Sequence, residues 1–238
     1  MTVDEPAISI VIPIHDEEPI LHAAVVDLRE RLSEVGYDWE LILAENGSRD
    51  NTVAVANELA RKYPNITVLN FPSPNYGAAL RQGLRAARGE FIICDEIDLC
   101  DTDFHWQALA LLSNPNVDMV LGSKLLSGAS DERPFLRHVS SQLYSALLRR
   151  GLGFRGTDTH GLKAVRRSSI LPVLDACIVD RDVFASELVI RSERASLNIL
   201  EIPIRVMEKR PPTINLVRRV PRVLSSVARL AWALRRSP

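Results

Sequence analysis

Residues 89–98, with the sequence GEFIICDEID, constrain the fold of this chain more than any other stretch. The apolar segment 91–94 is bounded by glycine and by charge, which is typical of a buried strand in a parallel sheet. Ligands of open α/β sheets bind beyond the carboxyl ends of such strands. Glu96 and Asp98 are separated by one residue, so in extended geometry both side chains point the same way. Two convergent carboxylates at a strand end suit Mg²⁺ or Mn²⁺ carrying a phosphate ligand, and a solvated acidic turn is the alternative.

Strand-like and helix-like segments alternate along the first half of the chain. Runs rich in β-branched residues predict strands, and apolar residues at helical spacing predict the helices between them. Four such units with short connections predict an α/β fold with a Rossmann-like, mostly parallel sheet flanked by helices. Pro203 lacks an N–H, which predicts an edge strand around it. The predicted strands are 8–14, 39–44, 66–71, 91–94, 117–122, 162–165 and 198–206; the predicted helices are 21–35, 52–63, 78–87, 101–112, 136–148 and 183–195; the predicted loops include 123–133 and 151–161.

The C-terminal end is basic, although the chain as a whole has a net charge of -1. From Pro203 onward there are nine Lys or Arg residues and a single Glu. Residues 214–234 place apolar side chains at helical spacing, with arginines on much of the remaining surface, and Pro221 is expected to divide this stretch into two helices. A basic amphipathic end is typical of helices that lie in a membrane interface, and packing against the sheet or in a homodimer is the alternative. We therefore divide the chain into a domain of residues 1–210 and amphipathic C-terminal helices of residues 211–238.

The composition, 46% hydrophobic and 25% charged, is that of an ordinary globular protein. The three cysteines have no paired spacing and no hydrophobic leader precedes them, which predicts reduced thiols and a cytoplasmic protein. No apolar run reaches the roughly 18 residues that span a bilayer, so the chain is not expected to cross a membrane on its own. The basic amphipathic end instead predicts peripheral contact with the inner face of a membrane, or with a membrane-protein partner. Nucleic-acid binding is not expected, because the C-terminal arginines alternate with an apolar face rather than with exposed aromatics.

Four short motifs occur in a fixed order: IPIHDEE, ENGSRDNT, NYGAALRQGLRAARGE and DEID. In this order and spacing the chain resembles the family-2 glycosyltransferases of the GT-A fold. The later segments VLGSKLLSG, FRGTDTHGLKAVRR and ILEIPIRVMEKR resemble the branch that transfers sugars to polyprenyl phosphates, which includes dolichyl-phosphate mannose synthase. The resemblance covers residues 8–210 approximately. It implies an inverting, metal-dependent hexosyltransferase that uses a nucleotide-sugar of the UDP or GDP type and a lipid phosphate acceptor.

The resemblance also implies roles for individual residues. Glu96 and Asp98 occupy the metal-binding positions, for Mg²⁺ or Mn²⁺, and Asp98 is also counted among the catalytic residues. A phosphate monoester is mostly a dianion at pH 7, so such an acceptor needs cationic positioning rather than a general base. The predicted catalytic residues are Asp98, Lys124, Arg137, Asp158, Lys163 and Arg210, and the predicted nucleotide-binding residues are Pro13, His15, Glu17, Glu45, Asn46, Asn75, Gly77 and Arg81. For Glu17, helix capping is an equal alternative.

Several positions depart from the pattern of that family, and two other functions therefore stay open. One is transfer to a hydroxyl of a soluble or glycan acceptor, with Asp158 or Asp180 as the base. The other is a non-catalytic protein that binds nucleotide-sugars. The helix bearing Glu187 lacks the Glu-Asp pair common in relatives that glycosylate hydroxyls, which favours the phosphate acceptor. The departures are His15-Asp16 for Tyr-Asn, Glu45-Asn46 for Asp-Asp, Glu96 for Asp, Cys100 for Gln, Lys124 for Arg and His160 for Ser.

Overall fold

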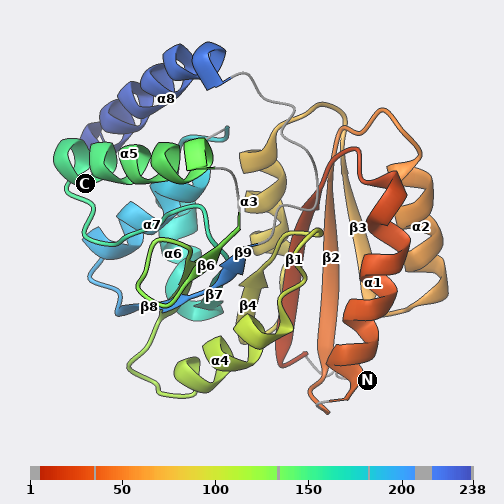
Figure 1. The fold of residues 1–238 in the computed structure, drawn as a ribbon. Helices are drawn as coiled ribbons and strands as arrows, with labels where there is room; N and C mark the ends of the chain where they lie inside the picture. Colours follow the sequence, from red (N-terminus) through yellow and green to blue (C-terminus); the bar gives the residue numbers. More distant parts are fainter. Residues whose placement is uncertain (1–5, 35, 133–134, 182, 207–215, 237–238) are drawn as a thin grey trace.

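A seven-stranded sheet forms the centre of the protein (Figure 1). The structure is a computed structural model, which describes residues 6–34, 36–132, 135–181, 183–206 and 216–236. The strand order is β3-β2-β1-β4-β7-β5-β8, and β7 runs antiparallel to both of its neighbours while the other pairs are parallel. The strands of this sheet are β1 (Ile8–Ile14), β2 (Trp39–Asn46), β3 (Ile66–Phe71), β4 (Phe91–Cys94), β5 (Met119–Ser123), β7 (Lys163–Arg166) and β8 (Ile199–Pro203), and a separate parallel pair joins β6 (Ser130–Asp131) to β9 (Arg205–Val206).

Helices cover both faces of the sheet. The apolar side chains of α1, α2 and α4 form one core with one face, and those of α3 and of α5 to α8 form a second core with the other face. Within β4, Ile92 and Cys94 belong to one core and Ile93 to the other. A strand that is buried on both faces needs apolar residues at every position, which explains why β4 is a continuous apolar run rather than an alternating one. The helices are α1 (Glu18–Ser33), α2 (Thr52–Lys62), α3 (Tyr76–Ala86), α4 (Thr102–Leu112), α5 (Phe135–Leu152), α6 (Arg167–Ala176), α7 (Phe184–Arg194) and α8 (Leu216–Arg236).

The predicted α/β fold with a mostly parallel sheet is confirmed, and so is the edge position of the strand that contains Pro203, since β8 is the last strand of the sheet. Several segments differ from the prediction. β6 lies inside the predicted loop 123–133, and the predicted strand 198–206 is divided into β8 and β9, which belong to different sheets. Helix α5 continues through the start of the predicted 151–161 loop to Leu152, and α6 has no predicted counterpart. A proline in the interior of α6, Pro172, lowers its apparent helical propensity, and the helix is held instead by the buried side chains of Ile170, Val173 and Leu174.

The predicted break at Pro221 is wrong, because α8 is one continuous helix over Leu216–Arg236. Pro221 is near the amino end of this helix, where the missing N–H removes one hydrogen bond to the first turn. The later turns are held by packing, since Val227, Leu230 and Leu234 are buried against the rest of the protein. None of the helices in the described part of the chain combines the length and the apolar character that a bilayer-spanning segment requires.

Candidate functional site

Most of the predicted site residues gather at one edge of the sheet. The carboxyl ends of β1, β2, β4 and β5 lie at this edge, together with the amino end of β7, because β7 runs antiparallel. The register pairs Cys94 at the end of β4 with Lys163 at the start of β7. This pairing brings the second half of the chain directly beside the acidic turn that follows β4.

Asp95, the first carboxylate after β4, points into the protein. Its Oδ2 atom lies 2.6 Å from Nε2 of His105 on α4, and both side chains are fully buried. Its Oδ1 atom accepts the N–H of Glu96 at 2.6 Å. Asp95 therefore fixes the direction in which the chain leaves the strand, and it is not available to a ligand.

Glu96 and Asp98 lie in a turn rather than in extended backbone, so the predicted extended geometry is wrong. The N–H groups of Leu99 and Cys100 both donate to the Glu96 carbonyl, at 2.9 and 3.0 Å. The Glu96 side chain is accessible to solvent, but partial desolvation by the surrounding protein and the charge of Asp98 raise the pKa of Glu96 to about 7. The positive charges of Lys124 and Lys163 oppose this shift. Desolvation and like charge both disfavour the ionised form. The two carboxylates are thus close enough to repel each other.

A divalent cation fits this pair, because it would offset the repulsion between Glu96 and Asp98. Within the described ranges, no group of three or more His, Cys, Asp or Glu residues is arranged to hold a metal ion. Mg²⁺ and Mn²⁺ in phosphate chemistry are commonly held by one or two carboxylates, with phosphate oxygens and waters as the other ligands. Glu96 and Asp98 are the residues that match this donor set.

A buried ion pair stands next to the acidic turn. Nζ of Lys124, just after β5, donates to Oδ2 of Asp158 at 2.6 Å. Burial would raise the pKa of the Asp158 carboxyl, but the charge and the hydrogen bond of Lys124 dominate and hold that pKa below its usual range. Lys163 is buried and donates to the Gly161 carbonyl at 2.7 Å, and burial lowers its pKa although Cys94, Asp158 and Glu96 oppose that shift. Two cations and three carboxylates therefore share one small region.

The predicted nucleotide residues lie around the carboxyl ends of β1 and β2 and the amino end of α3. Oδ1 of Asn46 accepts the N–H of Asn75, and Oδ1 of Asn75 caps α3 by accepting the N–H of Ala78 at 3.2 Å. The side chain of Glu45 accepts the N–H of Ser48 at 2.5 Å. In the described part of the chain, the buried Nδ1 of His15 has no hydrogen-bond partner. The chain thus leaves an unsatisfied polar atom where a nucleoside is expected.

Other predicted residues are placed differently. Glu17 stands at the N-cap position of α1, but its side chain makes no capping hydrogen bond. Arg81 turns toward α6 and α7, where it donates to the Leu174 carbonyl at 3.3 Å and stands over the ring of Phe184. Arg137 is half-buried on α5. Arg210 lies outside the described residues, and Pro13 and Gly77 lie at the end of β1 and in the first turn of α3.

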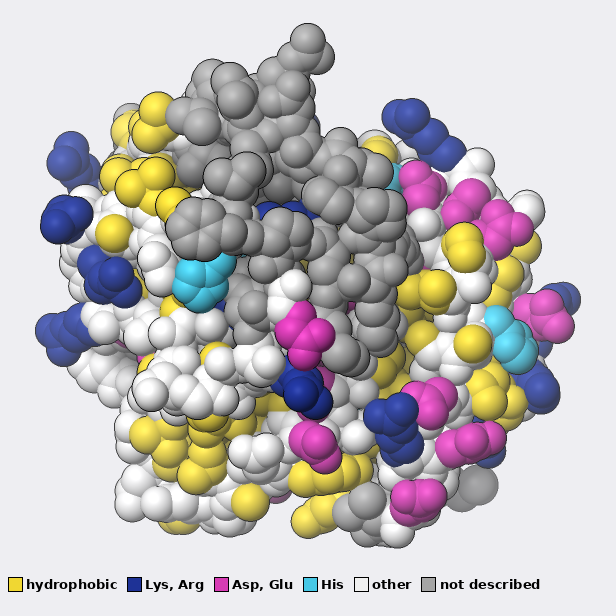
Figure 2. Space-filling model, viewed as in Figure 1, with side chains coloured by type: hydrophobic (Ala, Val, Ile, Leu, Met, Phe, Trp, Pro, Cys, Tyr) yellow, Lys and Arg dark blue, Asp and Glu magenta, His cyan; other side chains and the backbone are white. Residues whose placement is uncertain are grey.

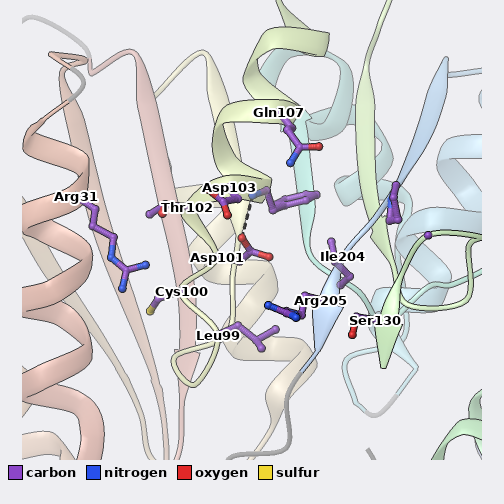
Figure 3. A pocket seen from close by; sticks show the side chains of 13 residues that line it. Arg31, Leu99, Cys100, Asp101, Thr102, Asp103, Gln107, Ser130, Ile204 and Arg205 are labelled. Carbon is purple, nitrogen blue, oxygen red and sulfur yellow. Dashed lines mark hydrogen bonds between the residues drawn. The ribbon is translucent and has the colours of Figure 1, made fainter. Parts of the chain in front are cut away.

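A cavity of about 470 Å³ lies beside the acidic turn, between α1, α4 and β9 (Figure 3). It begins one residue after Asp98, at Leu99, and its walls carry both charges, with Asp101 and Asp103 on one side and Arg205 on another. None of the predicted site residues lines it. We assign no ligand to this cavity.

Three polar residues of the site escape the sequence prediction. Ser123, Thr157 and Glu201 are joined by short hydrogen bonds, and they flank or face the two residues of the Lys124–Asp158 pair. Glu201 belongs to the segment ILEIPI, which is part of the family resemblance. Its hydrogen-bond partner Thr157 is distant in sequence, so the sequence alone does not indicate their contact. The contact of His105 with Asp95 could not be predicted either, because a histidine on an apolar helix does not indicate a buried carboxylate partner.

Comparison with known protein families and structures gives consistent matches. The model of the family described as Glycosyl transferase family 2 matches residues 9–173. The chain is 26% identical over 218 residues to a dolichyl-phosphate beta-glucosyltransferase, ALG5A, of Trichomonas vaginalis, covering 85% of this chain and 67% of the relative. It is also 26% identical over 232 residues to glycosyltransferase AglD of Haloferax volcanii, covering 95% of this chain but only 37% of that longer protein.

The fold is also shared with a solved structure. Glucosyl-3-phosphoglycerate synthase of Mycobacterium tuberculosis, in complex with Mn²⁺, UDP and phosphoglyceric acid, superimposes with a TM-score of 0.66 at 20% identity. The match covers 95% of this chain and 78% of that structure. At this identity the likeness establishes the GT-A architecture and nothing about the ligands.

Proposed function

Because the chain belongs to glycosyl transferase family 2, we propose that it is an inverting hexosyltransferase that moves a sugar from a nucleotide-sugar to a polyprenyl phosphate. An oxygen of the acceptor phosphate forms the new bond to the anomeric carbon, while the bond from that carbon to the nucleoside diphosphate breaks. The names of the two relatives support a sugar transferase, and that of ALG5A supports a lipid phosphate acceptor. The chain spans about two thirds of ALG5A and about a third of AglD, so their complete activities are not assumed.

The donor side of the proposal rests on the edge formed by β1, β2 and α3. The orphaned Nδ1 of His15 offers a hydrogen bond to a base or ribose, and the Asn46–Asn75 contact fixes the amino end of α3 nearby. A helix amino terminus favours anionic groups. We infer that this edge binds the nucleoside diphosphate, of the UDP or GDP type.

Glu96 and Asp98 would hold the Mg²⁺ or Mn²⁺ ion in this proposal. Such an ion, when bound, supplies positive charge that stabilises the departing diphosphate. The chain contributes the carboxylate pair and the fixed turn that Asp95 anchors.

The Lys124–Asp158 pair is the observation that carries the acceptor assignment. A hydroxyl acceptor needs a carboxylate with free proton-accepting capacity, but Asp158 already accepts from Lys124 and its pKa is held low. Glu187 is fully buried and accepts from Arg191 and from the N–H groups of Ile178 and Val179. An acceptor that is already anionic needs only cations, and Lys124 and Lys163 supply them.

A lipid acceptor must be collected from a bilayer, and the corner of the molecule formed by α5 and α8 has a suitable surface. Val139, Leu143, Leu224 and Trp232 are exposed there, and exposed arginines lie on the same two helices. Figure 2 shows hydrophobic and basic side chains next to each other over this corner, at the upper left. The other face of α8 is buried against the protein. We propose peripheral binding to the inner face of a membrane, and a homodimer or a membrane-protein partner would use the same surface.

A direct assay tests the function. Labelled UDP-hexoses and GDP-hexoses, with Mn²⁺ and a polyprenyl phosphate in detergent, should yield a labelled lipid. Replacing Lys124 by Met should lower kcat by about 10²- to 10³-fold, the usual effect of removing one preorganised charge donor, whereas Lys62→Met on the outer helix α2 should leave kcat unchanged. The double variant Lys124→Met with Asp158→Asn leaves no buried charge unpaired, so it separates lost catalysis from lost folding.

Three results would contradict parts of this proposal. Label transferred to a saccharide hydroxyl instead of the lipid would overturn the acceptor class and would favour a soluble or glycan acceptor. Full activity of Asp158→Asn on such an acceptor would then exclude Asp158 as its base. Tight UDP or GDP binding without turnover on any acceptor would indicate the non-catalytic alternative.

A further inference from the structure

Three polar side chains from distant parts of the sequence meet beside the Lys124–Asp158 pair. Oγ of Ser123, the last residue of β5, lies 2.6 Å from Oγ1 of Thr157. The hydroxyl of Thr157 also donates to Oε2 of Glu201 in β8 at 2.9 Å, and the Thr157 N–H donates to Oε1 of the same carboxylate at 2.8 Å. The register pairs Glu201 with Leu121. Since side chains alternate along a strand, Glu201 and Ser123 lie on the same face of the sheet.

The donors in this chain of hydrogen bonds have one consistent direction. A carboxylate only accepts, so Thr157 gives its single hydroxyl proton to Glu201. Ser123 must then give its own proton to Oγ1 of Thr157, which leaves Oγ of Ser123 free to accept. It does so from the N–H of Leu125 at 3.1 Å. The sequence of donors therefore runs from Leu125 through Ser123 and Thr157 to Glu201.

A second carboxylate holds the same loop. Glu193 on α7 accepts the N–H groups of Arg155 and Gly156, each at 3.2 Å. Together with Thr157, three consecutive N–H groups thus donate to two carboxylates. The loop is also pressed closely against β5, since a Cβ atom at Gly161 would lie 1.7 Å from the carbonyl oxygen of Gly122. The loop has little freedom to adopt another position.

These bonds enclose the ion pair from both sides. Ser123 and Leu125 are the neighbours of Lys124, and Thr157 is the neighbour of Asp158. Two side-chain contacts join the segments 123–125 and 157–158: Lys124–Asp158 at 2.6 Å and Ser123–Thr157 at 2.6 Å. Glu201 holds Thr157 in the second contact, because its two carboxylate oxygens accept from the N–H and the hydroxyl of Thr157.

We propose that Glu201, acting through Thr157 and Ser123, is a positioning residue that sets the place of the Lys124–Asp158 pair relative to the acceptor. The effect on the acceptor rests on the proposed function, whereas the role of Glu201 in holding the ion pair in place does not. Glu201→Gln keeps the shape but presents an amide NH₂ to one of the two Thr157 donors, which breaks one contact. Thr157→Val removes the bridging hydroxyl at nearly constant volume, and Thr157→Ser retains it.

The test combines two measurements on the full chain. Hydrogen–deuterium exchange should become faster, by about tenfold or more, in the segments 122–125 and 155–161 of Glu201→Gln and Thr157→Val, and it should return to the wild-type rate in Thr157→Ser. The kcat/KM for polyprenyl phosphate should fall by about 10- to 100-fold in the first two variants, the size of loss known for hydrogen-bond partners that orient metal ligands, while the calorimetric Kd for UDP or GDP stays unchanged. Ser169→Ala is the matched control. Ser169 lies on the remote helix α6, and its hydroxyl also donates to a carboxylate, that of Asp118, at 2.6 Å.

Each outcome is decisive. Unchanged exchange in both segments would overturn the structural part of the proposal, whatever the activity. Faster exchange with wild-type kcat/KM, or a loss no larger than that of Ser169→Ala, would overturn the positioning role. If the wild-type chain transfers no sugar to polyprenyl phosphate, the proposed function fails, and the exchange rates alone then decide whether the bridge holds the pair.

Discussion

Asp95, Glu96 and Asp98 have the same chemical group, but their surroundings give them different properties. Asp95 is fully buried against His105, so it is a structural group that directs the turn. Glu96 and Asp98 are not buried, and the charge of Asp98 adds to the desolvation that raises the pKa of Glu96. A nearby positive charge favours the ionised form of a carboxylate whose surroundings disfavour it. In the proposed function, a bound cation would relieve the repulsion between these two carboxylates, and this relief would contribute to its affinity.

The raised pKa of Glu96 makes stability depend on pH in a defined direction. Its pKa rises from 4.5 to about 7 on folding, so the protonated form favours the native state. That stabilisation is complete below pH 4.5 and is lost as the pH rises through 7. Glu96→Gln imitates the protonated form. In EDTA, urea unfolding should show similar stability of the two proteins near pH 4.5 and a clear advantage of Glu96→Gln at pH 8.

Glu58→Gln, at an exposed position on α2, controls for the loss of one negative charge. Its difference from the wild type should stay flat over the same pH range. The contribution of Asp158, whose pKa is lowered, has the opposite sign at lower pH, but it is common to all three proteins and cancels in the comparison. A Glu96→Gln difference that shrinks toward pH 8 would contradict the assigned shift.

Single residues were predictable where their chemistry follows a strand end. Glu96 and Asp98 lie at the expected edge of the sheet, because a short apolar run followed by charge marks such an end. Lys124, Asp158 and Lys163 lie at the same edge, but they were predicted from the family resemblance. The partners that hold them were not predictable. Ser123, Thr157 and Glu201 are ordinary polar residues, and only the three-dimensional register brings them into contact.

At the scale of elements, the direction of β7 decides how the site is assembled. The sequence of a short apolar strand does not indicate whether the strand runs parallel or antiparallel to its neighbours. Residues 162–165 were therefore predicted as a strand, but without an orientation. Being antiparallel, β7 begins at the edge where β4 and β5 end, and the loop before it delivers Asp158 to Lys124. A parallel β7 would place these two residues at opposite edges of the sheet.

The amino end of α3 provides a test at this scale. A Cβ atom at Gly77 would lie 2.6 Å from the carbonyl oxygen of Asp180 and 2.7 Å from Cβ of Phe184. Gly77→Ala should therefore displace the Asp180 backbone, weaken its contact with Asn75 and cost about 1–3 kcal/mol of unfolding free energy. Urea unfolding measures the cost, and calorimetry with UDP and GDP should show weaker binding.

Gly151→Ala is the matched control, since Gly151 lies in α5 with no atom within 4 Å of the added Cβ. Its stability should be unchanged or higher by up to about 1 kcal/mol, because alanine favours helix over glycine. Equal nucleotide affinity in Gly77→Ala and Gly151→Ala would exclude the amino end of α3 from the nucleotide site.

At the scale of the whole molecule, α8 has one face that packs against the protein and another that carries exposed side chains. One face packs into the core through Val227, Leu230 and Leu234, and the carbonyls at its carboxyl end accept from arginines of α7: Arg191 to Ala233 at 3.3 Å and Arg194 to Leu234 at 2.8 Å. The periodicity of residues 214–234 showed that an apolar face exists. It could not show that the protein itself covers the part of that face formed by Val227, Leu230 and Leu234, because this depends on α5 and α7.

In the proposed function, the exposed side chains of the α5–α8 corner contact a membrane, and their contribution to vesicle binding can be measured. Leu143 is 70% exposed and Trp232 is 51% exposed, and replacing the more exposed Leu143 by Asp should change stability by no more than about 0.5 kcal/mol. Both changes remove apolar area and add a negative charge beside arginines. Co-sedimentation with vesicles containing anionic lipid should therefore fall clearly in Leu143→Asp, in Trp232→Asp and, for the wild type, at high salt.

Tyr37→Asp separates a specific surface from general stickiness, because Tyr37 is also 51% exposed but lies between α1 and β2, away from α5 and α8. It should sediment with vesicles as the wild type does. If all three variants bind vesicles equally, the α5–α8 corner is not the membrane surface. If the wild type does not bind vesicles but sediments as a dimer that Leu143→Asp dissociates, the corner is a contact between two copies of the chain. The apolar area and the arginines would then serve assembly, and the lipid phosphate would have to reach Lys124 from another side.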